Sequence, residues 1–483
     1  MRVPELLHQS ALKFPDQIAI YDNIGTLTYK ELSDAVKSTA TMLKANGIPV
    51  SKGVGVMGGN SRYFIIMVFA VMESGAVVMP VSNQVIKSEL DDIIKTAGLS
   101  VLIDDGTNDY PYKNTSIINC VGQQWRIYFN ESVAASSTFA SHVNDPALIR
   151  FTSGTTGTSK GVILSHQTIF ERTESANKVL QLGSNDRIIW VLSMAYHFVV
   201  SIILYLRYGS SVIICNEFLA DTIIDETNRF NGTFLYASPM HIRMLASDNS
   251  GRMMPTLQKV ISTSTAIPKE HCIAFKNRFG IAVSQAYGII EIGLPIINFE
   301  KSDQFPDAVG YALPDYTVEI LDNNFNILSS DETGHLAIKG PGMLDGYLNP
   351  PATRDQILNN GWFMTGDLAS KMDDGLIRIE GRMKSMINVS GNKVFPEEVE
   401  TILNQHPLIA ESKVSGYVHS LLGESVRAEI VLHPHSTKPD TESLRTFCRM
   451  YLSAYKTPQQ FIYVESLPKT DSGKLKRVIE KGH

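Results

Sequence analysis

The chain has few charged residues and few cysteines. Charged residues make up 19% of its 483 residues and the formal net charge is -6, which excludes both a disordered composition and the overall positive charge typical of nucleic-acid-binding proteins. The cysteines are widely spaced and form no Cys-x-x-Cys motif: Cys120, Cys215, Cys272 and Cys448. We therefore expect reduced, buried thiols in a cytoplasmic protein that does not bind nucleic acid.

The sequence also lacks a hydrophobic run long enough to cross a membrane. Its most apolar stretch, 63–81, is interrupted by Glu73, Ser74 and Gly75, well short of the ~20 residues that a transmembrane helix needs. We interpret this stretch as a buried helix that runs into a strand. Residues 1–16 lack the basic and apolar regions of a signal peptide, so we expect neither a leader nor an integral membrane segment.

Alternating strand and helix patterns predict an α/β fold with more than one domain. Short β-rich runs are separated by helical patterns, which is typical of a largely parallel sheet: 53–57, 76–80, 100–103 and 211–214. A chain of this length exceeds what one hydrophobic core usually supports. We expect a large N-terminal α/β domain (1–382), with subdomains of mixed sheets and helices, and a small mobile C-terminal α+β domain (383–483).

A polar loop occupies residues 152–161, with the sequence Thr-Ser-Gly-Thr-Thr-Gly-Thr-Ser-Lys-Gly between two strand-like runs. Glycines let the backbone approach an anion, hydroxyls and amides donate hydrogen bonds to its oxygens, and Lys160 adds a positive charge. The pattern predicts a loop that binds polyphosphate. It is not a Walker A loop, because Ser159 precedes Lys160 and Gly161 follows it. A flexible surface loop is the alternative, which the length of the motif and its Lys-Gly ending disfavour.

This loop resembles the phosphate loop of the adenylate-forming superfamily, which includes acyl-CoA synthetases, aryl-CoA ligases, peptide-synthetase adenylation domains and luciferases. The resemblance extends from residue 27 to residue 474, with the motifs in the family's order. It implies that Thr155 and Lys160 act in catalysis on a bound ATP. The other expected phosphate contacts are Thr152, Ser153, Gly154, Thr156 and Gly157.

The segment Gln-Ala-Tyr-Gly-Ile-Ile-Glu, which ends at Glu291, resembles the family's Tyr-Gly-x-Thr-Glu motif. The resemblance implies that Tyr287 stacks on adenine beside Gly288, and that Glu291 and Thr155 help to hold magnesium. A nucleotide-bound magnesium ion takes one or two carboxylates together with phosphate and water, so a single Glu suffices. Ile290 departs from the family pattern. A Thr or Ser there would donate to the α-phosphate, and isoleucine cannot donate.

Two further motifs resemble the family's ribose-binding residues. Asp367 ends a Thr-Gly-Asp motif and Arg382 follows Gly381. The resemblance implies that both contact the ribose hydroxyls, the carboxylate as acceptor and the guanidinium as donor. The segment 340–348 resembles another family motif, which we interpret as structural.

The last hundred residues contain the family's domain-rotation elements. Lys384 stands at the position of the hinge, about which the small domain would turn between adenylation and thioester formation. Gly391 would line the passage of the thiol. Lys474, near the C-terminal end, is expected to be catalytic, because a cation can bridge the attacking carboxylate and the leaving pyrophosphate.

The resemblance also places the substrate pocket. His197 stands where the family has an aromatic residue or His at the mouth of the acyl pocket, and the other predicted pocket residues are Ser262, Ala266 and Gly288. Phe198 replaces the Asp by which adenylation domains bind an α-amino acid. An ordinary α-amino acid is therefore disfavoured, because its ammonium would be buried without a partner.

These motifs predict an AMP-forming acid–thiol ligase. With ATP and Mg²⁺, it would form an acyl-adenylate from an aryl, medium-chain or long-chain carboxylic acid and transfer the acyl group to coenzyme A, releasing AMP and pyrophosphate. One alternative is an acyl-AMP ligase that loads an acyl-carrier protein. Another, suggested by Ile290, is a nucleotide-binding regulatory protein without catalysis. The identity of the acid and the oligomeric state, a homodimer included, stay open.

Overall fold

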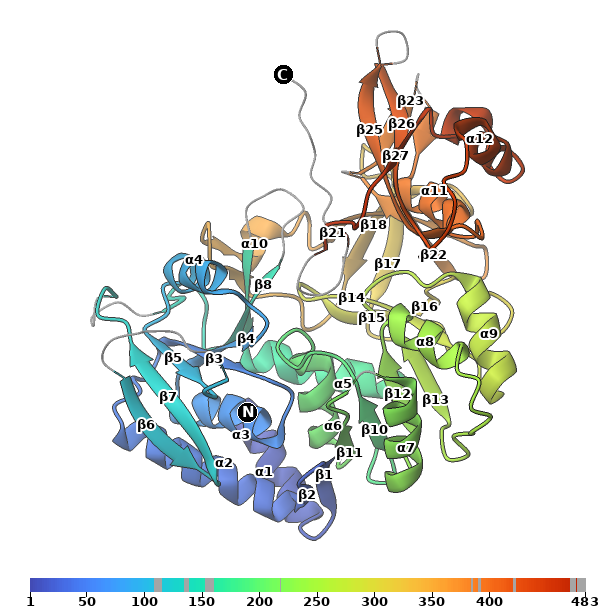
Figure 1. Ribbon diagram of the computed structural model, residues 1–483. Coiled ribbons are helices and arrows are strands. Elements are labelled where there is room, and N and C mark those ends of the chain that lie inside the picture. Colours follow the sequence, from blue (N-terminus) through green and yellow to red (C-terminus); the bar gives the residue numbers. More distant parts are fainter. Residues whose placement is uncertain are drawn as a thin grey trace. The chain divides into compact units, whose positions relative to one another are not determined.

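The computed structural model describes the whole chain except residues 108–114, 134–138, 153–159, 218, 384, 390–391, 420–422, 470–474 and 476–483. Its described part is a mixed α/β structure that divides into two compact units (Figure 1). The first unit comprises 1–152, 159–317 and 339–363, and the second comprises 318–338 and 364–483. The boundary expected after residue 382 lies within the second unit, because the strands on both sides of 339–363 belong to one sheet. A hinge near this position stays a prediction.

One sheet of the first unit has parallel central strands and antiparallel edges. Nine of the described strands belong to it, in this spatial order: β16 (Tyr311–Ala312), β15 (Gly293–Ile297), β14 (Ser284–Ile289), β13 (Lys259–Ser262), β12 (Phe234–Ala237), β10 (Arg187–Trp190), β11 (Ser211–Ile214), β1 (Ile18–Asp22) and β2 (Gly25–Thr28). Ile189, Leu235 and Val260 form a buried core with the helices on one face, α7 (Ala220–Phe230), α8 (Pro239–Ala246) and α9 (Lys269–Phe279) (Figure 1).

The second sheet of this unit contains the two strands predicted on either side of the polar loop. Nine of the described strands form it: β20 (Ala352–Thr353), β19 (Gly346–Tyr347), β9 (Lys160–Ser165), β8 (Pro146–Thr152), β4 (Val77–Ser82), β3 (Gly53–Gly58), β5 (Val101–Asp104), β7 (Gln123–Phe129) and β6 (Thr115–Cys120). β8 and β9 pair antiparallel, with Thr152 opposite Lys160. The runs expected as strands are β3, β4, β5 and β11, and β3 pairs in parallel with both β4 and β5.

The apolar stretch at 63–81 forms α3 (Arg62–Ser74) followed by β4, both of which are almost entirely buried. The hydroxyl of Ser61 caps α3 by accepting a hydrogen bond from the N–H of Phe64, and the helix ends at Gly75, whose φ of 93° favours glycine. No helix of the described residues is long and apolar enough to cross a membrane. The remaining helices of this unit are α1 (Val3–Lys13), α2 (Tyr29–Ala45), α4 (Lys87–Ala97), α5 (His166–Leu180), the π-helical η1 (Phe198–Ile203), α6 (Leu204–Arg207) and α10 (Arg354–Ile357).

The second unit is of the α+β type, as the sequence predicts for the C-terminal part. Its first sheet contains β17 (Thr317–Leu321), β18 (Gly334–Lys339), β21 (Phe363–Lys371) and β22 (Ile377–Arg382). Its second sheet contains β24 (Asn392–Val394), β23 (Ile387–Val389), β26 (Gly423–Leu432), β25 (Ile409–His419) and β27 (Gln460–Tyr463). Val399, Leu403 and Leu444 join this sheet to α11 (Pro396–Leu403) and α12 (Thr441–Arg449) in one core. A short 3₁₀ helix, η2 (Ala454–Lys456), follows α12.

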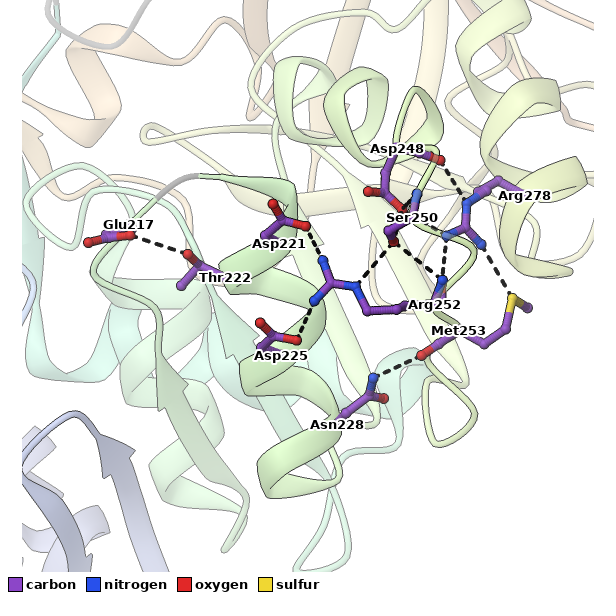
Figure 2. A network of polar contacts seen from close by, with 10 residues as sticks. All are labelled: Glu217, Asp221, Thr222, Asp225, Asn228, Asp248, Ser250, Arg252, Met253 and Arg278. Atoms are coloured by element: carbon purple, nitrogen blue, oxygen red, sulfur yellow. Dashed lines mark hydrogen bonds and ion pairs between the residues drawn. The ribbon is translucent and has the colours of Figure 1, made fainter.

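A polar network fixes the loop between α8 and β13 to its neighbouring helices (Figure 2). Arg252 lies between Asp221 and Asp225 of α7 and forms ion pairs with both. Arg278 of α9 donates to a carboxylate oxygen of Asp248 at 2.8 Å and to the carbonyl oxygen of Arg252 at 2.6 Å. The carboxylates of α7 are exposed, so each of their ion pairs with Arg252 contributes only about 0–1 kcal/mol to the stability of the fold. The network contains none of the predicted site residues.

The four cysteines are free and buried. Burial raises the pKa of each thiol, to about 12 in Cys215 and Cys272 and to about 11 in Cys448. These thiols therefore stay protonated and unreactive at neutral pH. This arrangement agrees with the expectation of reduced, buried cysteines.

Candidate active site

The hairpin formed by β14 and β15 carries Tyr287, Gly288 and Glu291. Tyr287 and Gly288 belong to β14, and Glu291 follows it in the turn. A Cβ atom at Gly288 would lie 2.5 Å from the carbonyl oxygen of Gly293, so any larger residue would push the two strands apart. The side chains of Tyr287 and Glu291 are partly exposed. The motif residues thus meet on one tight hairpin, as their spacing predicts.

Arg172 of α5 holds the turn of this hairpin through its backbone. Its guanidinium donates to the carbonyl oxygens of Ile290 at 2.6 Å and Glu291 at 2.8 Å, and to that of Gly342. Burial lowers the pKa of Arg172 to about 10, so the group is still charged at neutral pH. Hydrogen bonds from a charged donor are stronger than neutral ones, and they satisfy carbonyl groups of the turn that no sheet partner reaches. The sequence gives no signal for this residue, because it stands outside every motif.

Tyr347 of β19 lies near two of the predicted site residues. Its hydroxyl is close enough to the Glu291 carboxylate for that group to act on its pKa. The Nζ atom of Lys160 lies 4.5 Å from the centre of the Tyr347 ring. Burial, followed by the charge of Glu291, raises the pKa of Tyr347, so its hydroxyl keeps its proton and can donate at neutral pH. Sequence reasoning missed this role, since Tyr347 lies in the segment 340–348 that we interpreted as structural.

Arg150 adds a further positive charge near Glu291. It lies on β8, and its guanidinium carbon is 5.6 Å from the centre of the Tyr196 ring. Loss of hydration lowers the pKa of Arg150 to about 10, and the charge of Glu291 opposes this shift. Arg150 and Arg172 are both close enough to Glu291 for its charge to raise their pKa values. Such a region favours an anionic ligand such as a polyphosphate.

Glu291 fits the carboxylate of a nucleotide-bound magnesium site. Within the described part of the chain, no group of three or more His, Cys, Asp or Glu could hold a metal ion by itself. Magnesium bound with a nucleotide needs no such cluster, because phosphates and water supply most of its oxygen ligands. A single partly exposed carboxylate therefore suits this ion. The predicted contribution of Thr155 falls outside the described residues.

His197 lies directly before η1, and its Nε2 atom is 3.4 Å from the hydroxyl of Ser264. Ser264 has a φ of 80°, a left-handed conformation that is strained for a residue with a side chain. Ala266 is exposed in the same turn. The structure thus brings His197 to the turn that follows β13, where Ala266, one of the predicted pocket residues, lies.

Ser262 is buried at the end of β13, opposite Ala237 of β12 and Gln285 of β14. Paired residues of neighbouring parallel strands share a face of the sheet. Ser262 is therefore on the same face as Ala237, which packs into the core with α8 and α9. The hydroxyl of Ser262 has no hydrogen-bond partner among the described residues. Its place in the acyl pocket stays a prediction.

In the second unit, Asp367 and Arg382 lie opposite each other on the paired strands β21 and β22. The Nε atom of Arg382 is 3.0 Å from a carboxylate oxygen of Asp367. The Asp367 carboxylate is buried, whereas 44% of the Arg382 side chain is exposed. The strand register therefore brings together an acceptor and a donor that could contact a diol.

The remaining predicted site residues lie outside the described residues. They are Ser153, Gly154, Thr155, Thr156, Gly157, Lys384, Gly391 and Lys474. Thr152 ends β8, but its side chain is not described. The roles of all these residues stay predictions.

The arrangement of motifs agrees with a known family of enzymes. The family model for AMP-binding enzymes matches residues 7–348, and the model for the AMP-binding enzyme C-terminal domain matches residues 398–474. This chain belongs to the AMP-binding enzyme family. The match confirms the predicted superfamily of adenylate-forming acyl- and aryl-CoA ligases and the predicted fold class.

Relatives of this AMP-binding enzyme include several acid–CoA ligases. The sulfoacetate–CoA ligase of Cupriavidus necator is 31% identical over 340 residues, which cover 69% of this chain and 66% of that ligase. The 2-succinylbenzoate–CoA ligase of a Geobacillus species is 27% identical over 481 residues, which cover 98% of this chain and 96% of that ligase.

Solved structures share the fold over nearly the whole chain. The ATP-bound MatB from Rhodopseudomonas palustris has a TM-score of 0.84 and 25% identity, with 99% of this chain and 97% of that chain covered. The o-succinylbenzoate CoA synthetase MenE from Bacillus subtilis, in complex with the acyl-adenylate intermediate OSB-AMP, has a TM-score of 0.87 at 22% identity. Its alignment covers 99% of this chain and 98% of that chain.

Proposed function

We propose that this AMP-binding enzyme converts a carboxylic acid and ATP into an acyl-adenylate and pyrophosphate, and then transfers the acyl group to coenzyme A with release of AMP. The observation that carries the proposal is the cluster around Glu291. There, a carboxylate suited to a nucleotide's magnesium ion lies among Arg150, Arg172 and Tyr347, and the Tyr347 ring supports Lys160 at the end of the polyphosphate loop.

In the first half-reaction, a carboxylate oxygen attacks the α-phosphorus of ATP and the bond to pyrophosphate breaks. Both reactants are anions, so fixed positive charges lower the barrier. Lys160 would offset phosphate charge from the loop, and Lys474 would bridge the attacking and leaving groups. A magnesium ion held by Glu291 would offset further negative charge of the phosphates. Tyr287 would stack on the adenine.

The ribose would be held by Asp367 and Arg382, which the strand register already pairs. In the second half-reaction, a thiolate attacks the acyl carbonyl carbon, a C–S bond forms, and the bond to the AMP oxygen breaks. Lys384 would serve as the hinge for the change between the two half-reactions. Gly391 would leave room for the pantetheine arm.

The acid is an aryl, medium-chain or long-chain carboxylic acid rather than an ordinary α-amino acid. Phe198 is 3% exposed and packs against the rings of Phe64 and Phe69, with centroid distances of 6.2 Å and 6.0 Å. It belongs to the apolar core and offers no partner for an ammonium group. Burying an unpaired ammonium is costly, so this position supports an uncharged acyl group near it.

Acid-dependent exchange of labelled pyrophosphate into ATP tests the first half-reaction across a panel of acids. The expected result is exchange with a narrow set of aryl or acyl substrates. If no acid supports exchange while ATP still binds, the non-catalytic nucleotide-binding alternative holds instead. With an active acid, AMP release is then compared with coenzyme A and with a phosphopantetheinylated carrier protein. Release with the carrier protein alone would favour the acyl-AMP ligase.

A further inference from the structure

Arg150 projects from the same face of its sheet as Lys160. It lies on β8, opposite Val162 of β9, and Tyr347 of β19 lies opposite the same valine on the other side. Residues directly opposite each other share a face of the sheet, and so do residues two positions apart on one strand. The side chains of Arg150, Lys160 and Tyr347 therefore leave one face, near the ends of β8 and β9 that border the predicted polyphosphate loop.

The other face of these strands is apolar. Ile149 and Ile163 lie opposite each other and are buried in a core that also contains Val77. Phe151 and Leu348 pack against the same core. The register therefore separates an apolar face of the two strands from a face that carries two cations close to the loop.

The Arg150 guanidinium has a buried N–H group that finds no acceptor in the described part of the chain. Its Nε atom is buried and has no hydrogen-bond partner among the described residues. The contact found there for the guanidinium is with the ring of Tyr196, whose centre lies 5.6 Å from the guanidinium carbon. An aromatic ring attracts the charge but leaves the buried N–H without an oxygen acceptor.

Two other arginines of this unit are buried, and both have oxygen acceptors. Arg62 donates to both carboxylate oxygens of Asp22, at 2.6 Å and 2.5 Å, and Arg172 donates to three carbonyl oxygens. A guanidinium that has lost water without gaining an acceptor is costly for the folded protein. Arg150 therefore lowers the stability of the free protein, and a ligand that brings the missing oxygens would compensate for this cost.

We propose that Arg150 is a binding residue for an oxyanion, a phosphate or carboxylate group that a ligand of the site supplies. A planar guanidinium can donate two parallel N–H bonds to two oxygens of one such group. The polyphosphate of the nucleotide is the expected source, because Arg150 shares its face of the sheet with Lys160 beside the predicted loop. This inference rests on the proposed function, since it takes the ligands to be ATP and a carboxylic acid.

The first experiment compares the thermal stability of the full-length protein with and without ATP. Arg150→Met keeps much of the aliphatic stem and removes the charged group. Without ligand, the Tm of the variant should equal or exceed that of the wild type. The rise in Tm that ATP produces should be smaller in the variant, because this rise grows with affinity. A lower Tm of the free variant would make Arg150 a structural residue and overturn the proposal.

The second experiment measures nucleotide affinity in EDTA by isothermal titration calorimetry. Loss of hydrogen bonds from a charged donor should make Arg150→Met bind ATP about 10- to 100-fold more weakly than the wild type. Adenosine, which carries no phosphate, should bind to both proteins with the same affinity. An equal loss of affinity for adenosine would indicate a general distortion of the nucleotide site, and the proposal would then be wrong.

Arg187→Met is the matched control. The guanidinium carbon of Arg187 also lies 5.6 Å from the centre of a tyrosine ring, that of Tyr21, but Arg187 donates to the carbonyl oxygen of Phe230 at 2.7 Å. It thus has the same kind of ring contact together with an acceptor of its own. The control variant should have a lower Tm and an unchanged affinity for ATP. A loss of ATP affinity as large as that of Arg150→Met would contradict a specific role of Arg150.

A third measurement identifies the source of the oxyanion. With an acid that supports pyrophosphate exchange, the KM for that acid is compared between Arg150→Met and the wild type. An unchanged affinity for ATP together with a KM about 10- to 100-fold higher would make the carboxylate of the acid the bound oxyanion, and the binding role of Arg150 would stand. If neither the affinity for ATP nor the KM changes, the proposal falls.

Thermal stability and ATP affinity need no acid substrate, so they can be separated from the proposed activity. If pyrophosphate exchange fails with every acid but ATP binding depends on Arg150, the binding role stands and the ligase proposal falls. If exchange proceeds and Arg150→Met changes neither ATP affinity nor the KM for the acid, the ligase proposal stands and the binding role falls.

Discussion

The guanidinium of Arg172 donates a hydrogen bond of 2.8 Å to the carbonyl oxygen of Glu291, a residue 119 positions further along the chain. A second bond reaches the carbonyl oxygen of Ile290 at 2.6 Å. The turn that presents the candidate metal-binding carboxylate is thus held from α5 and does not depend on its own sequence alone. The shape of the site therefore depends on a residue that belongs to none of the family motifs.

Arg172→Met tests this support. The methionine keeps much of the aliphatic volume but leaves buried carbonyl groups without their charged donor, which should destabilise the protein by roughly 2–4 kcal/mol. Thermal denaturation should show a lower Tm, and affinity for ATP with Mg²⁺ should fall. Arg229→Met is the control, because 61% of the Arg229 side chain is exposed and its guanidinium contacts only surface partners that include Glu226 and the ring of Phe230. Equal Tm values for the two variants would contradict the role of Arg172.

Ile290→Thr tests the departure from the family motif. The Ile290 side chain is partly buried, and its carbonyl group is fixed by Arg172, so the exchange should leave the turn in place. We expect adenylation of the native acid to stay within about tenfold, and the preference among acids to change, since such a swap alters a pocket by only ~1–3 kcal/mol. Measuring kcat/KM for several acids checks this.

A uniform gain of about a hundredfold for every acid in Ile290→Thr would have a different meaning. It would match the recovery of a missing transition-state donor, which is worth about 10²–10³ in rate. The wild-type site would then be an impaired one. An unchanged ranking at unchanged rates would place the Ile290 side chain away from both phosphate and substrate.

Lys474→Ala should separate the two half-reactions. We expect adenylation to fall by about 10²–10³, as for loss of one charge-stabilising group, while thioester formation from supplied acyl-adenylate stays nearly intact. Lys469→Ala is the control, because the Nζ atom of Lys469 lies 2.6 Å from a carboxylate oxygen of Glu411 in a solvent-accessible ion pair. Equal losses in both half-reactions of Lys474→Ala would argue against a role confined to adenylation.

His241 of α8 should make stability depend on pH. It is 5% exposed, its Nδ1 atom lies 2.7 Å from the hydroxyl of Ser238, and burial lowers its pKa from 6.5 to about 4. The unfolded chain therefore takes up this proton at a higher pH than the folded protein. The contribution of His241 to the free energy of unfolding is therefore fully present above pH 6.5. It is lost as the pH falls toward 4, and the total loss is roughly 3 kcal/mol.

His241→Asn removes this titration and keeps a polar group for Ser238. When the pH is lowered from 7 to 5, the Tm of the variant should fall less than the Tm of the wild type. His166, whose pKa burial also lowers to about 4, is present in both proteins, so the difference between them isolates His241. The same fall in Tm for both proteins would refute the assignment.

The sequence determined the fold class, the family and the motif residues of the hairpin. Tyr287, Gly288 and Glu291 lie within five consecutive positions, so a local pattern is enough to place them together. The strands on either side of the polyphosphate loop could likewise be predicted, because apolar β-rich runs border a run without apolar side chains.

Only the tertiary structure decided which distant side chains complete the site. Arg150, Arg172 and Tyr347 come from a strand, a helix and a two-residue strand that stand far apart in the chain. The strand register decides that Tyr347 lies opposite Val162 and that Ser262 shares a face with Ala237. A shift of one residue would turn each of these side chains to the other face of its sheet. Such placement results from the packing of the whole core, which no local motif encodes.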